Sequence, residues 1–356
     1  TKFLKVSMKS INIEIENKPT CYQINIDNNI IFNLNKFLSE NHFSKVVLIY
    51  DLNINSSLVE SITQINDQCL TLPLDINSSN KTIEQFYSIH EQLNENNIDK
   101  SSLIIALGGG SIGDLVGFIA STFHRGVSYI QIPTTLLSMI DSSIGGKTGL
   151  DLDYGKNLIG SFHHPLAVFI DTVFLKTLSL KELHSGLFEI IKYGIALDSE
   201  LFYFIRDNKN QLFEKNILNQ IIEWCCKIKS DIIMKDERDS GIRNKLNFGH
   251  TIGHAIESLY KIRHGEAIGI GMKYAANLSK KINSIDENKY TDIIDLINFF
   301  NPPIIDINID DIIEIMKNDK KRIDDKYNFI LLNDIGSSYI SDEITPNQLK
   351  DILTNR

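Results

Sequence analysis

Three histidines lie within fifteen positions of one another in the carboxy-terminal half of the chain. His250 and His254 stand four residues apart, which places both imidazoles on one face of a helix, and His264 lies at the start of the next predicted helix. Imidazole nitrogens and a carboxylate are ligands that zinc prefers, so the cluster predicts a metal site. The spacing leaves open whether His250 and His254 are both ligands or one of them is an acid–base group. The candidate carboxylates are Glu189, Glu257 and Glu266.

A glycine-rich segment follows a short apolar run in the amino-terminal half. Residues 103–107 are typical of a buried strand, and the segment Gly108-Gly-Gly-Ser-Ile-Gly-Asp114 is typical of a loop that opens a helix. Glycines let the backbone approach a pyrophosphate, and a helix amino terminus offers free N–H groups to it. The segment predicts a dinucleotide site, although its spacing departs from the usual fingerprint. Asp51 ends an earlier apolar run, and its carboxylate favours NAD over NADP because it would repel a 2′-phosphate.

Hydroxyls, glycines and lysines gather in residues 133–137 and 141–148. The sequence Gly-Gly-Lys-Thr is similar to the end of a phosphate loop, but that loop needs a glycine where Asp141 stands, which excludes it. Further cations and amides near these segments or near the histidines predict a small anionic substrate. They are Lys147, Lys156, Asn157, Lys229, Arg243, Asn247, Lys320 and Lys321.

The composition excludes several classes of protein. Lysine and arginine number 36 against 45 aspartate and glutamate, a net charge of −9, which argues against a nucleic-acid partner. Four cysteines are too few and too scattered for a disulfide framework or a thiolate zinc cluster, so we expect a reducing, cytoplasmic location. No apolar run reaches the roughly 18 residues that a membrane helix needs, so we expect no membrane partner.

The apolar pattern changes along the chain. Over residues 1–178, strand-like runs alternate with helical stretches, which predicts an α/β domain with a parallel sheet and Rossmann-like nucleotide binding. Residues 179–356 predict a mainly α-helical domain that binds metal and substrate, with the site in the crevice between the two. The expected strands are 11–15, 22–26, 46–50, 103–107, 129–132, 168–170, 329–332 and 339–341, with 11–15 and 22–26 as one hairpin and the last two as another. The expected helices are 82–95, 181–196, 211–234, 247–260, 266–281 and 286–300.

Several motifs occur in a fixed order between about residues 46 and 335. They are Leu107-Gly-Gly-Gly-Ser-Ile-Gly-Asp-Leu-Val-Gly-Phe118, Arg125-Gly-Val, Ile132-Pro-Thr-Thr-Leu-Leu, Asp141-Ser-Ser-Ile-Gly-Gly-Lys-Thr148, Gly155-Lys-Asn-Leu-Ile-Gly160, Ser185-Gly-Leu-Phe-Glu-Ile-Ile-Lys-Tyr-Gly194, Asp236-Glu-Arg, Leu246-Asn-Phe-Gly-His-Thr-Ile-Gly-His-Ala-Ile-Glu257, His264-Gly-Glu266 and Asp319-Lys-Lys321. Together they resemble the 3-dehydroquinate synthase family of sugar phosphate cyclases.

The resemblance implies a carbon–oxygen lyase that depends on NAD and on a divalent metal, zinc or cobalt. Such an enzyme converts 3-deoxy-D-arabino-heptulosonate 7-phosphate, a phosphorylated sugar acid, to 3-dehydroquinate and phosphate in the shikimate pathway of aromatic amino acid biosynthesis. NAD transiently oxidises C5, phosphate is eliminated, hydride returns, and an intramolecular aldol step closes the ring. The metal acts as a Lewis acid on the C5 oxygen.

The resemblance also implies roles for single residues. It makes Glu189, His250 and His264 the metal ligands, and it brings Arg125 to the neighbouring subunit of a homodimer. The implied catalytic residues are Lys147, Lys192, Lys229, Arg243, Asn247 and His254. The implied substrate-binding residues are Asp141, Lys147, Asn157, Arg125, Lys320 and Lys321. The implied cofactor-binding residues are Asp51, Lys81, Gly109, Gly110, Ser111, Ile112, Gly113, Asp114, Thr134, Thr135, Lys147, Lys156, Phe174, Leu175, Lys176 and Thr177.

The chain departs from the family pattern at a few places. The family usually has Gly-Glu shortly before the lysine that aligns with Lys81, and residues 74–81 lack this pair, which predicts a weaker grip on the adenosine ribose. Asp239 stands where the family favours glutamate, and residues 161–165 are also atypical. None of these departures touches an implied metal ligand.

Other activities compete with this reading. A sister cyclase that acts on sedoheptulose 7-phosphate or glucose 6-phosphate would share the fold, NAD and metal. A metal-dependent polyol dehydrogenase would release NADH, and a non-catalytic partner would not need an intact metal set. Lys229, Arg243 and Asn247 occur together with His254, which favours a carboxylated substrate.

Overall fold

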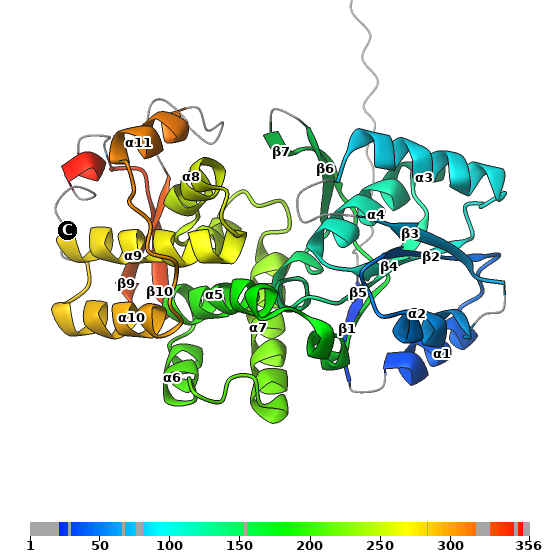
Figure 1. The fold of residues 1–356 in the computed structure, drawn as a ribbon, viewed down its shortest axis with the longest axis horizontal. Coiled ribbons are helices and arrows are strands. Elements are labelled where there is room, and N and C mark those ends of the chain that lie inside the picture. Colours follow the sequence, from blue (N-terminus) through cyan, green and yellow to red (C-terminus); the bar gives the residue numbers. More distant parts are fainter. Residues whose placement is uncertain are drawn as a thin grey trace, which may run out of the picture.

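A six-stranded parallel sheet forms the centre of the amino-terminal part in the computed structural model (Figure 1). The structure describes residues 21–27, 30–65, 68–75, 81–152, 155–282, 284–317, 328–344 and 348–351. The strand order is β1-β8-β5-β4-β2-β3, and each neighbouring pair runs parallel. The strands are β1 (Gln23–Ile26), β2 (Val46–Asp51), β3 (Leu70–Leu74), β4 (Leu103–Gly108), β5 (Ser128–Pro133) and β8 (Ala167–Ile170).

Helices cover both faces of this sheet. The alternation of side chains along β2 explains why, since Leu48 packs in the apolar cluster of α1 and α2, whereas Val47 and Ile49 pack in the cluster of α3 and α4. A strand that is buried on both faces has a continuous apolar sequence, as β2 does. The parallel sheet predicted from the sequence is confirmed. The helices are α1 (Ile30–Glu40), α2 (Ser56–Thr63), α3 (Ile83–Glu95), α4 (Gly110–Thr122) and the 3₁₀ turn η1 (Phe123–Arg125).

An antiparallel hairpin, which we did not predict as strands, stands beside α4. It consists of β6 (Lys147–Leu152) and β7 (Gly155–Phe162), and it contains the segments we assigned only to anion binding. Its two strands approach closely at Gly149 and Gly160, where a Cβ atom would collide with the backbone of the opposite strand. Most of β7 is exposed, so the segment lacks the period-two burial pattern that identifies a strand.

The remainder of the chain is mainly helical, as predicted. The helices predicted here begin and end within a few residues of the expected positions, and the predicted carboxy-terminal hairpin is confirmed. The short helices at Ser199–Asp207 and Ile309–Lys317 were not predicted. The elements are η2 (Ser138–Ser142), η3 (Thr172–Thr177), α5 (Leu180–Leu197), α6 (Ser199–Asp207), α7 (Lys215–Lys235), η4 (Ile242–Asn247), α8 (His250–Tyr260), α9 (His264–Lys281), α10 (Glu287–Phe299), α11 (Ile309–Lys317), β9 (Phe329–Asp334) and β10 (Ser337–Ser341).

The predicted strand 11–15 lies outside the described residues, and the strand at 22–26 corresponds to β1, which pairs in parallel with β8. The predicted domain boundary near residue 178 stays a prediction. One apolar cluster contains residues from both sides of it, for example Ile130 of β5, Met139 of η2 and Phe188 of α5.

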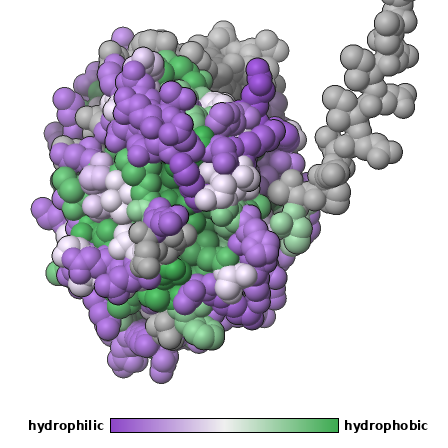
Figure 2. Space-filling view, turned by 90° about the vertical axis from the view of Figure 1, so that its right-hand side faces the viewer, coloured by the Kyte–Doolittle hydropathy of each residue, from purple (hydrophilic) through white to green (hydrophobic). Residues whose placement is uncertain are grey.

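The surface is mixed in character. Figure 2 views the end of the molecule formed by the sheet and its helices, and shows hydrophobic residues in a band between hydrophilic ones. Large apolar side chains exposed on the α/β elements include Phe32, Leu52 and Tyr87. Within the described residues, no helix combines the length and the apolar composition that crossing a bilayer requires.

Candidate active site

The three histidines of the sequence cluster meet in space. α8 begins at His250 directly after Gly249, whose φ of +78° makes the turn from η4, and a Cβ atom there would lie 2.7 Å from Met272 Cγ. The ring centroids of His250 and His254 are 5.1 Å apart, and His264 lies 5.4 Å and 5.6 Å from them. One ring nitrogen from each histidine lies within 4.8 Å of the others, a spacing that suits a common cation.

Glu189 of α5 completes this cluster from a third helix. Its side chain is fully buried, and its Oε1 lies 3.6 Å from His250 Nε2 and 3.3 Å from His264 Nε2. Lys192, one turn along α5, pairs with Oε2. Neither oxygen accepts a hydrogen bond of ordinary geometry in the described part of the chain. A buried carboxylate is costly unless a cation satisfies it, so the donor set fits a metal ion.

Hydrogen bonds on the far side of two imidazoles fix their orientation. His250 Nδ1 lies 3.2 Å from the carbonyl oxygen of Phe248, and His264 Nδ1 lies 2.9 Å from Glu257 Oε2. An N–H at each Nδ1 donates to these oxygens, so each Nε2 faces Glu189. Ligating histidines in metal sites are commonly held in this way.

The charges of the cluster also fit a cation. Burial would raise the pKa of Glu189, but the Lys192 ammonium and the protonated His264 hold it well below its ordinary value. Burial lowers the pKa of His264, whereas its contacts with the carboxylates of Glu189 and Glu257 outweigh burial and raise it to about 9. Burial keeps the pKa of His250 well below its ordinary value, so that imidazole is neutral. The cluster therefore holds the Lys192 ammonium and the protonated His264 beside the carboxylates of Glu189 and Glu257, and a divalent ion can take the place of the proton on His264.

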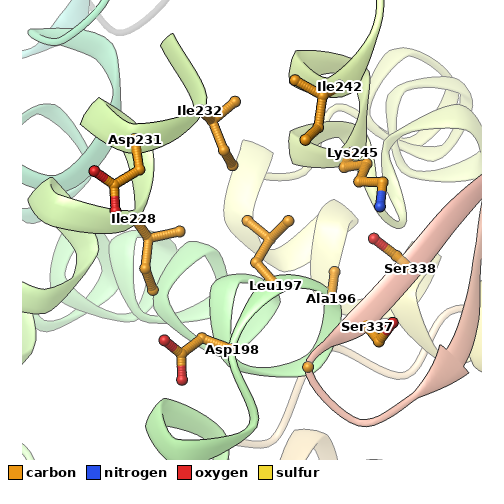
Figure 3. Close-up of a pocket in the computed structure, with 11 residues that line it drawn as sticks. Ala196, Leu197, Asp198, Ile228, Asp231, Ile232, Ile242, Lys245, Ser337 and Ser338 are labelled. Carbon is orange, nitrogen blue, oxygen red and sulfur yellow. The ribbon is translucent and has the colours of Figure 1, made fainter. Parts of the chain in front are cut away.

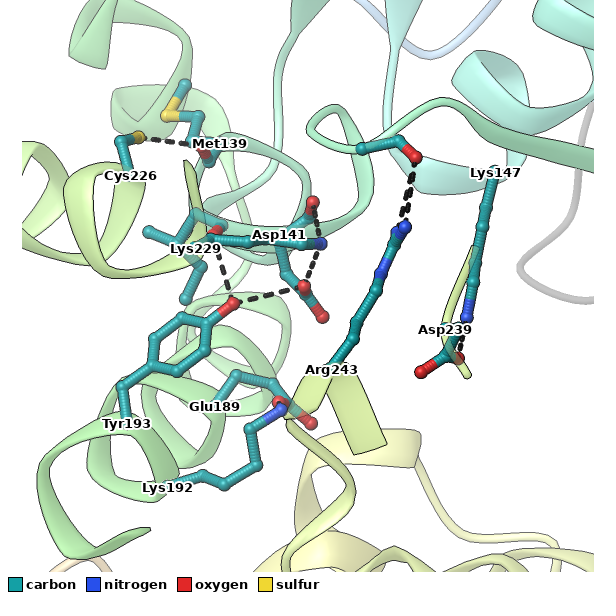
Figure 4. Close-up of polar contacts among 12 residues, drawn as sticks. Met139, Asp141, Lys147, Glu189, Lys192, Tyr193, Cys226, Lys229, Asp239 and Arg243 are labelled. Atoms are coloured by element: carbon teal, nitrogen blue, oxygen red, sulfur yellow. Dashed lines mark hydrogen bonds and ion pairs between the residues drawn. The ribbon is translucent and has the colours of Figure 1, made fainter. Parts of the chain in front are cut away.

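A second polar cluster lies beside the first (Figure 4). Lys229 of α7 is buried and pairs with Asp141 of η2, and the hydroxyl of Tyr193 donates to Asp141 Oδ1 at 3.1 Å. Burial would raise the pKa of Asp141, but Lys229 and then Lys192 lower it to about 2. We did not single out Tyr193 from the sequence, although a tyrosine inside a buried helix needs a partner for its hydroxyl.

Arg243 and Lys147 border these clusters. Arg243 is buried in η4, its Nη1 and Nη2 donate to the carbonyl oxygen of Gly145 at 3.3 Å and 3.2 Å, and its backbone N–H donates to Asp236 at 3.0 Å. Lys147, at the start of β6, pairs with Asp239. Asn247 ends η4, three residues before His250. The structure thus brings residues that we predicted to face the substrate together from η2, β6, α5, α7 and η4.

The glycine-rich segment is a strand, a loop and a helix start, as predicted. β4 ends at Gly108 and α4 begins at Gly110, and Gly109 caps the helix without a side-chain hydrogen bond, which leaves its first N–H groups to a ligand. A Cβ atom at Gly110 would lie 2.8 Å from Ser142 Oγ, and one at Gly109 would lie 3.1 Å from Thr135 Cγ2. The backbone N–H of Thr134 donates to Gly108 at 2.9 Å. The carboxyl ends of β4 and β5 therefore form one glycine- and threonine-lined edge.

Several predicted nucleotide residues contact one another at this edge. Lys81 is buried, its Nζ lies 2.6 Å from Asp114 Oδ2 and 3.8 Å from Asp151 Oδ1, and it also donates to Asn157. The backbone of Asn157 is left-handed at φ +56°. Asn157, which we expected to face the substrate, therefore contacts Lys81, which we expected to bind the nucleotide.

Other predicted cofactor residues have local or packing contacts. Asp51 Oδ1 accepts hydrogen bonds from the backbone and the side chain of Asn53, both at 2.9 Å. The side chains of Ile112, Phe174 and Leu175 are buried in the apolar clusters. The residues whose side chains pack less deeply are Ser111, Lys176 and Thr177, while Gly113 lies against Gln131.

Arg125 is not brought to the site within one chain, and two further predicted residues are not among those that the structure describes. Arg125 lies at the far end of α4 from the glycine loop, about 20 Å along a helix of 13 residues. Lys320 and Lys321 lie outside the described residues.

A cavity of about 290 Å³ lies between α5, α7, η4 and the turn that joins β9 to β10 (Figure 3). Its walls come from the ends or reverse sides of α5, α7 and η4, which carry Glu189, Lys229 and Arg243, and from the turn between β9 and β10. None of the predicted site residues lines it. The lining residues are Ala196, Leu197, Asp198, Ile228, Asp231, Ile232, Ile242, Lys245, Gly336, Ser337 and Ser338.

Comparison with known proteins places the chain in a family. Residues 71–185 match the 3-dehydroquinate synthase N-terminal family and residues 186–322 match its C-terminal counterpart. The 3-dehydroquinate synthase of Clostridium acetobutylicum is 39% identical over 92% of this chain and 95% of its own length. That of Colwellia psychrerythraea is 39% identical over 97% of this chain and 100% of its own length.

A solved structure shares the fold at lower identity. The 2-epi-5-epi-valiolone synthase of Streptomyces hygroscopicus, solved with NAD+ and Zn2+ bound, superposes with a TM-score of 0.87 at 22% identity and covers 96% of this chain and 98% of its own. Its identity is low enough that it establishes the fold alone. The sequence matches go further, because they cover most of both chains at close to 40% identity. The chain belongs to the 3-dehydroquinate synthase family of enzymes.

Proposed function

We propose that this chain converts 3-deoxy-D-arabino-heptulosonate 7-phosphate to 3-dehydroquinate and phosphate, with NAD and a zinc or cobalt ion as cofactors. Family membership supports the reaction, and the valiolone synthase of the same fold was solved with NAD+ and Zn2+. The observation that carries the proposal is the meeting of Glu189, His250 and His264 from three helices, with both Nε2 atoms directed at one buried carboxylate.

Glu189, His250 and His264 would hold the metal. When bound, the ion polarises the oxygen at C5 of the substrate and the neighbouring hydroxyl. Phe248 and Glu257 keep the two imidazoles in the tautomer that offers Nε2, and Lys192 balances the charge of Glu189. His254 lies beside the ligands on the same face of α8, where its imidazole would exchange a proton with a substrate hydroxyl.

The edge formed by β4, β5 and α4 would hold NAD. When bound, the nicotinamide serves as the transient acceptor of hydride from C5. The free N–H groups at the start of α4 would bind the pyrophosphate, and Thr134 and Thr135 line the same edge. Asp51 lies at the carboxyl end of β2, two strands from the β5 edge, in a position suited to ribose hydroxyls.

Three buried cations would bind and orient the anionic substrate. Lys192, Lys229 and Arg243 are each at most 5% exposed and lie on α5, α7 and η4 around the histidines. Buried cations bind carboxylate and phosphate more strongly than exposed ones, because water does not compete for them. Asp141 and Tyr193 keep Lys229 in place, so its ammonium is aimed before the substrate arrives.

The proposal extends to organisation. Two domains, 1–178 and 179–356, would enclose the substrate between the nucleotide edge and the histidine cluster. Arg125, remote from the glycine loop within one chain, would serve the neighbouring subunit of a homodimer. A reducing, cytoplasmic setting would suit the four free cysteines.

A phosphate-release assay tests the reaction. We expect the protein with NAD and Zn2+ or Co2+ to release phosphate from the heptulosonate phosphate without net accumulation of NADH. Sedoheptulose 7-phosphate and glucose 6-phosphate serve as comparison substrates. Faster release from either of them would assign the chain to a sister cyclase activity, and a steady rise of NADH absorbance would indicate a dehydrogenase.

A further inference from the structure

Glu257 of α8 contacts two groups that come from distant parts of the chain. Its Oε2 accepts a hydrogen bond from His264 Nδ1 at 2.9 Å, and its Oε1 pairs with Lys156 Nζ at 2.7 Å. The Glu257 side chain is 17% exposed, whereas that of Lys156 is 61% exposed. One carboxylate thus joins the β6–β7 hairpin to a residue of the histidine cluster.

The geometry separates Glu257 from the ligands themselves. Glu189 lies at the Nε2 side of His264, and Glu257 lies at its Nδ1 side. The two nitrogens of an imidazole point in widely divergent directions, so a carboxylate held at Nδ1 does not bind the ion that Nε2 faces. Glu257, which the sequence left as a possible metal ligand, therefore acts behind the ligand.

Neighbouring residues of the hairpin reach opposite sides of the site. Asn157 accepts from Lys81, which pairs with Asp114 of the glycine-loop helix, while Lys156 extends to Glu257. The left-handed backbone of Asn157, at φ +56°, puts a local bend in the strand between the two contacts. The hairpin is therefore tied to the nucleotide edge and to the histidine cluster by adjacent side chains.

We propose that Glu257 is a positioning residue that fixes the orientation and tautomer of His264, and that Lys156 anchors Glu257 from the hairpin. The inference deepens the proposed function, because it takes His264 to be a metal ligand. Its effect is on how well the site holds a metal, so it is measured without turnover.

Glu257→Gln is the central test, because the amide keeps the shape of the side chain and removes its charge. An amide can also donate to Nδ1, which favours the tautomer with a proton on Nε2 and so competes with metal binding. We expect the affinity for Co2+, measured by competition with a chromophoric chelator, to fall roughly 10- to 100-fold. We also expect the visible absorption bands of bound Co2+ to shift, while the circular dichroism spectrum of the metal-free protein stays that of the wild type.

Glu287→Gln is the matched control. Glu287 pairs with Lys280 of α9, the helix that His264 begins, but at the opposite end of that helix. Glu287→Gln removes one carboxylate charge, as Glu257→Gln does, but it should leave both the Co2+ affinity and the absorption spectrum unchanged. An equal loss in this variant would mean that any weakening of α9 loosens the metal, which would overturn the inference.

Lys156→Met tests the anchor. The pair is half exposed on the lysine side, so we expect a smaller loss of Co2+ affinity, within about 5-fold. In the Glu257→Gln background the same substitution should have no further effect, because the partner charge is already gone. Fully additive losses would contradict an anchor that works through Glu257.

Two results would overturn the role of Glu257 itself: a wild-type Co2+ affinity in Glu257→Gln, or a weakened affinity with an unshifted spectrum. Failure of the proposed function looks different. A wild-type protein that binds Co2+ with the expected dependence on Glu257 but releases no phosphate would leave the positioning role standing and refute the reaction.

Discussion

The nucleotide edge and the histidine cluster satisfy their charged groups in different ways. At the nucleotide edge, Lys81 pairs with Asp114 and donates to Asn157, so the side chains satisfy one another. In the histidine cluster, Glu189 is fully buried, and the Nε2 atoms of His250 and His264 face its Oε1 without a hydrogen bond of ordinary geometry among the described residues. The first arrangement is complete by itself. In the second, Lys192 pairs with Glu189 Oε2, and a metal ion would complete the side where Oε1 faces the two imidazoles.

The difference reflects the kind of donor that each ligand needs. In the proposed nucleotide site, a pyrophosphate would bind backbone N–H groups at the start of α4, so the nearby side chains would be free to stabilise the fold. A metal ion needs side-chain ligands, so the ligand atoms that face the ion cannot also be used in internal pairs, whereas the other atoms of the same side chains can. We therefore expect substitutions at the nucleotide edge to act mainly on stability and those in the histidine cluster mainly on metal binding.

His264→Ala should have the largest effect. It removes one proposed ligand, so we expect the affinity for Zn2+ to fall by more than roughly 100-fold, a larger loss than we expect for Glu257→Gln. Phosphate release should also be lost. The circular dichroism spectrum should match that of the wild type, because His264 is the first residue of α9 and supports no apolar cluster.

His184→Ala is a suitable control, since His184 stacks on Phe213 at 6.3 Å and lies outside the cluster. If the His264 variant retained zinc, His264 would not be a ligand. His254 would then have to be reassigned as a ligand beside Glu189 and His250. Inductively coupled plasma mass spectrometry of dialysed protein distinguishes these outcomes.

Lys81→Met should instead act on the fold. The lysine is 5% exposed and lies between the carboxylates of Asp114 and Asp151, so its removal leaves two negative charges facing each other without a cation. Breaking a buried pair of this kind costs about 3–5 kcal/mol, which we expect as a loss in the free energy of unfolding in urea.

Lys36→Met provides the comparison, because Lys36 is 64% exposed and forms only a long pair with Glu40. Its unfolding free energy should be nearly unchanged. If Lys81→Met lowered the affinity for NAD at unchanged stability, Lys81 would serve the ligand rather than its neighbours, and the contrast between the two regions would disappear.

The sequence predicted the histidine cluster better than the nucleotide edge, for a physical reason. His250 and His254 share a helix face by periodicity alone, and apolar runs such as residues 103–107 predict buried strands. The pair of Lys81 and Asp114 joins residues 33 positions apart through a loop, and no local pattern encodes it. The hairpin was missed because β7 is mostly exposed and rich in polar residues and glycine.

The roles of Tyr193 and Glu257 were also beyond the reach of sequence patterns. Each side chain acts on a partner brought in by tertiary packing, Asp141 from η2 and Lys156 from β7. Their residue types are ordinary for a helix, so only the fold reveals the contacts.

Acid should reduce the contribution of Asp141 to the free energy of unfolding, by less than the loss expected for Lys81→Met. Its pKa is about 2 in the fold against an ordinary value of 3.8, so its carboxylate stabilises the protein above pH 4 and loses this contribution as the pH falls toward 2. The shift corresponds to about 2 kcal/mol. We expect the difference in unfolding free energy between the wild type and Asp141→Asn to narrow by that amount between pH 5 and pH 2, and a constant difference would contradict the assignment.

Asp239→Asn should have the smallest effect, although it breaks an ion pair between the hairpin and the helical part. Lys147 is 51% exposed in this pair, so water screens the charges and we expect a loss of less than about 1 kcal/mol in unfolding free energy. Asparagine also tolerates the left-handed backbone of Asp239, at φ +59°, so the substitution adds no strain. Asp239→Val removes the same charge but introduces a β-branched residue at that φ, and it should cost more. The two variants could instead lose equal amounts of unfolding free energy, close to the loss expected for Lys81→Met. The ion pair with Lys147 would then determine the stability of this contact, and its exposure to water would not predict its strength.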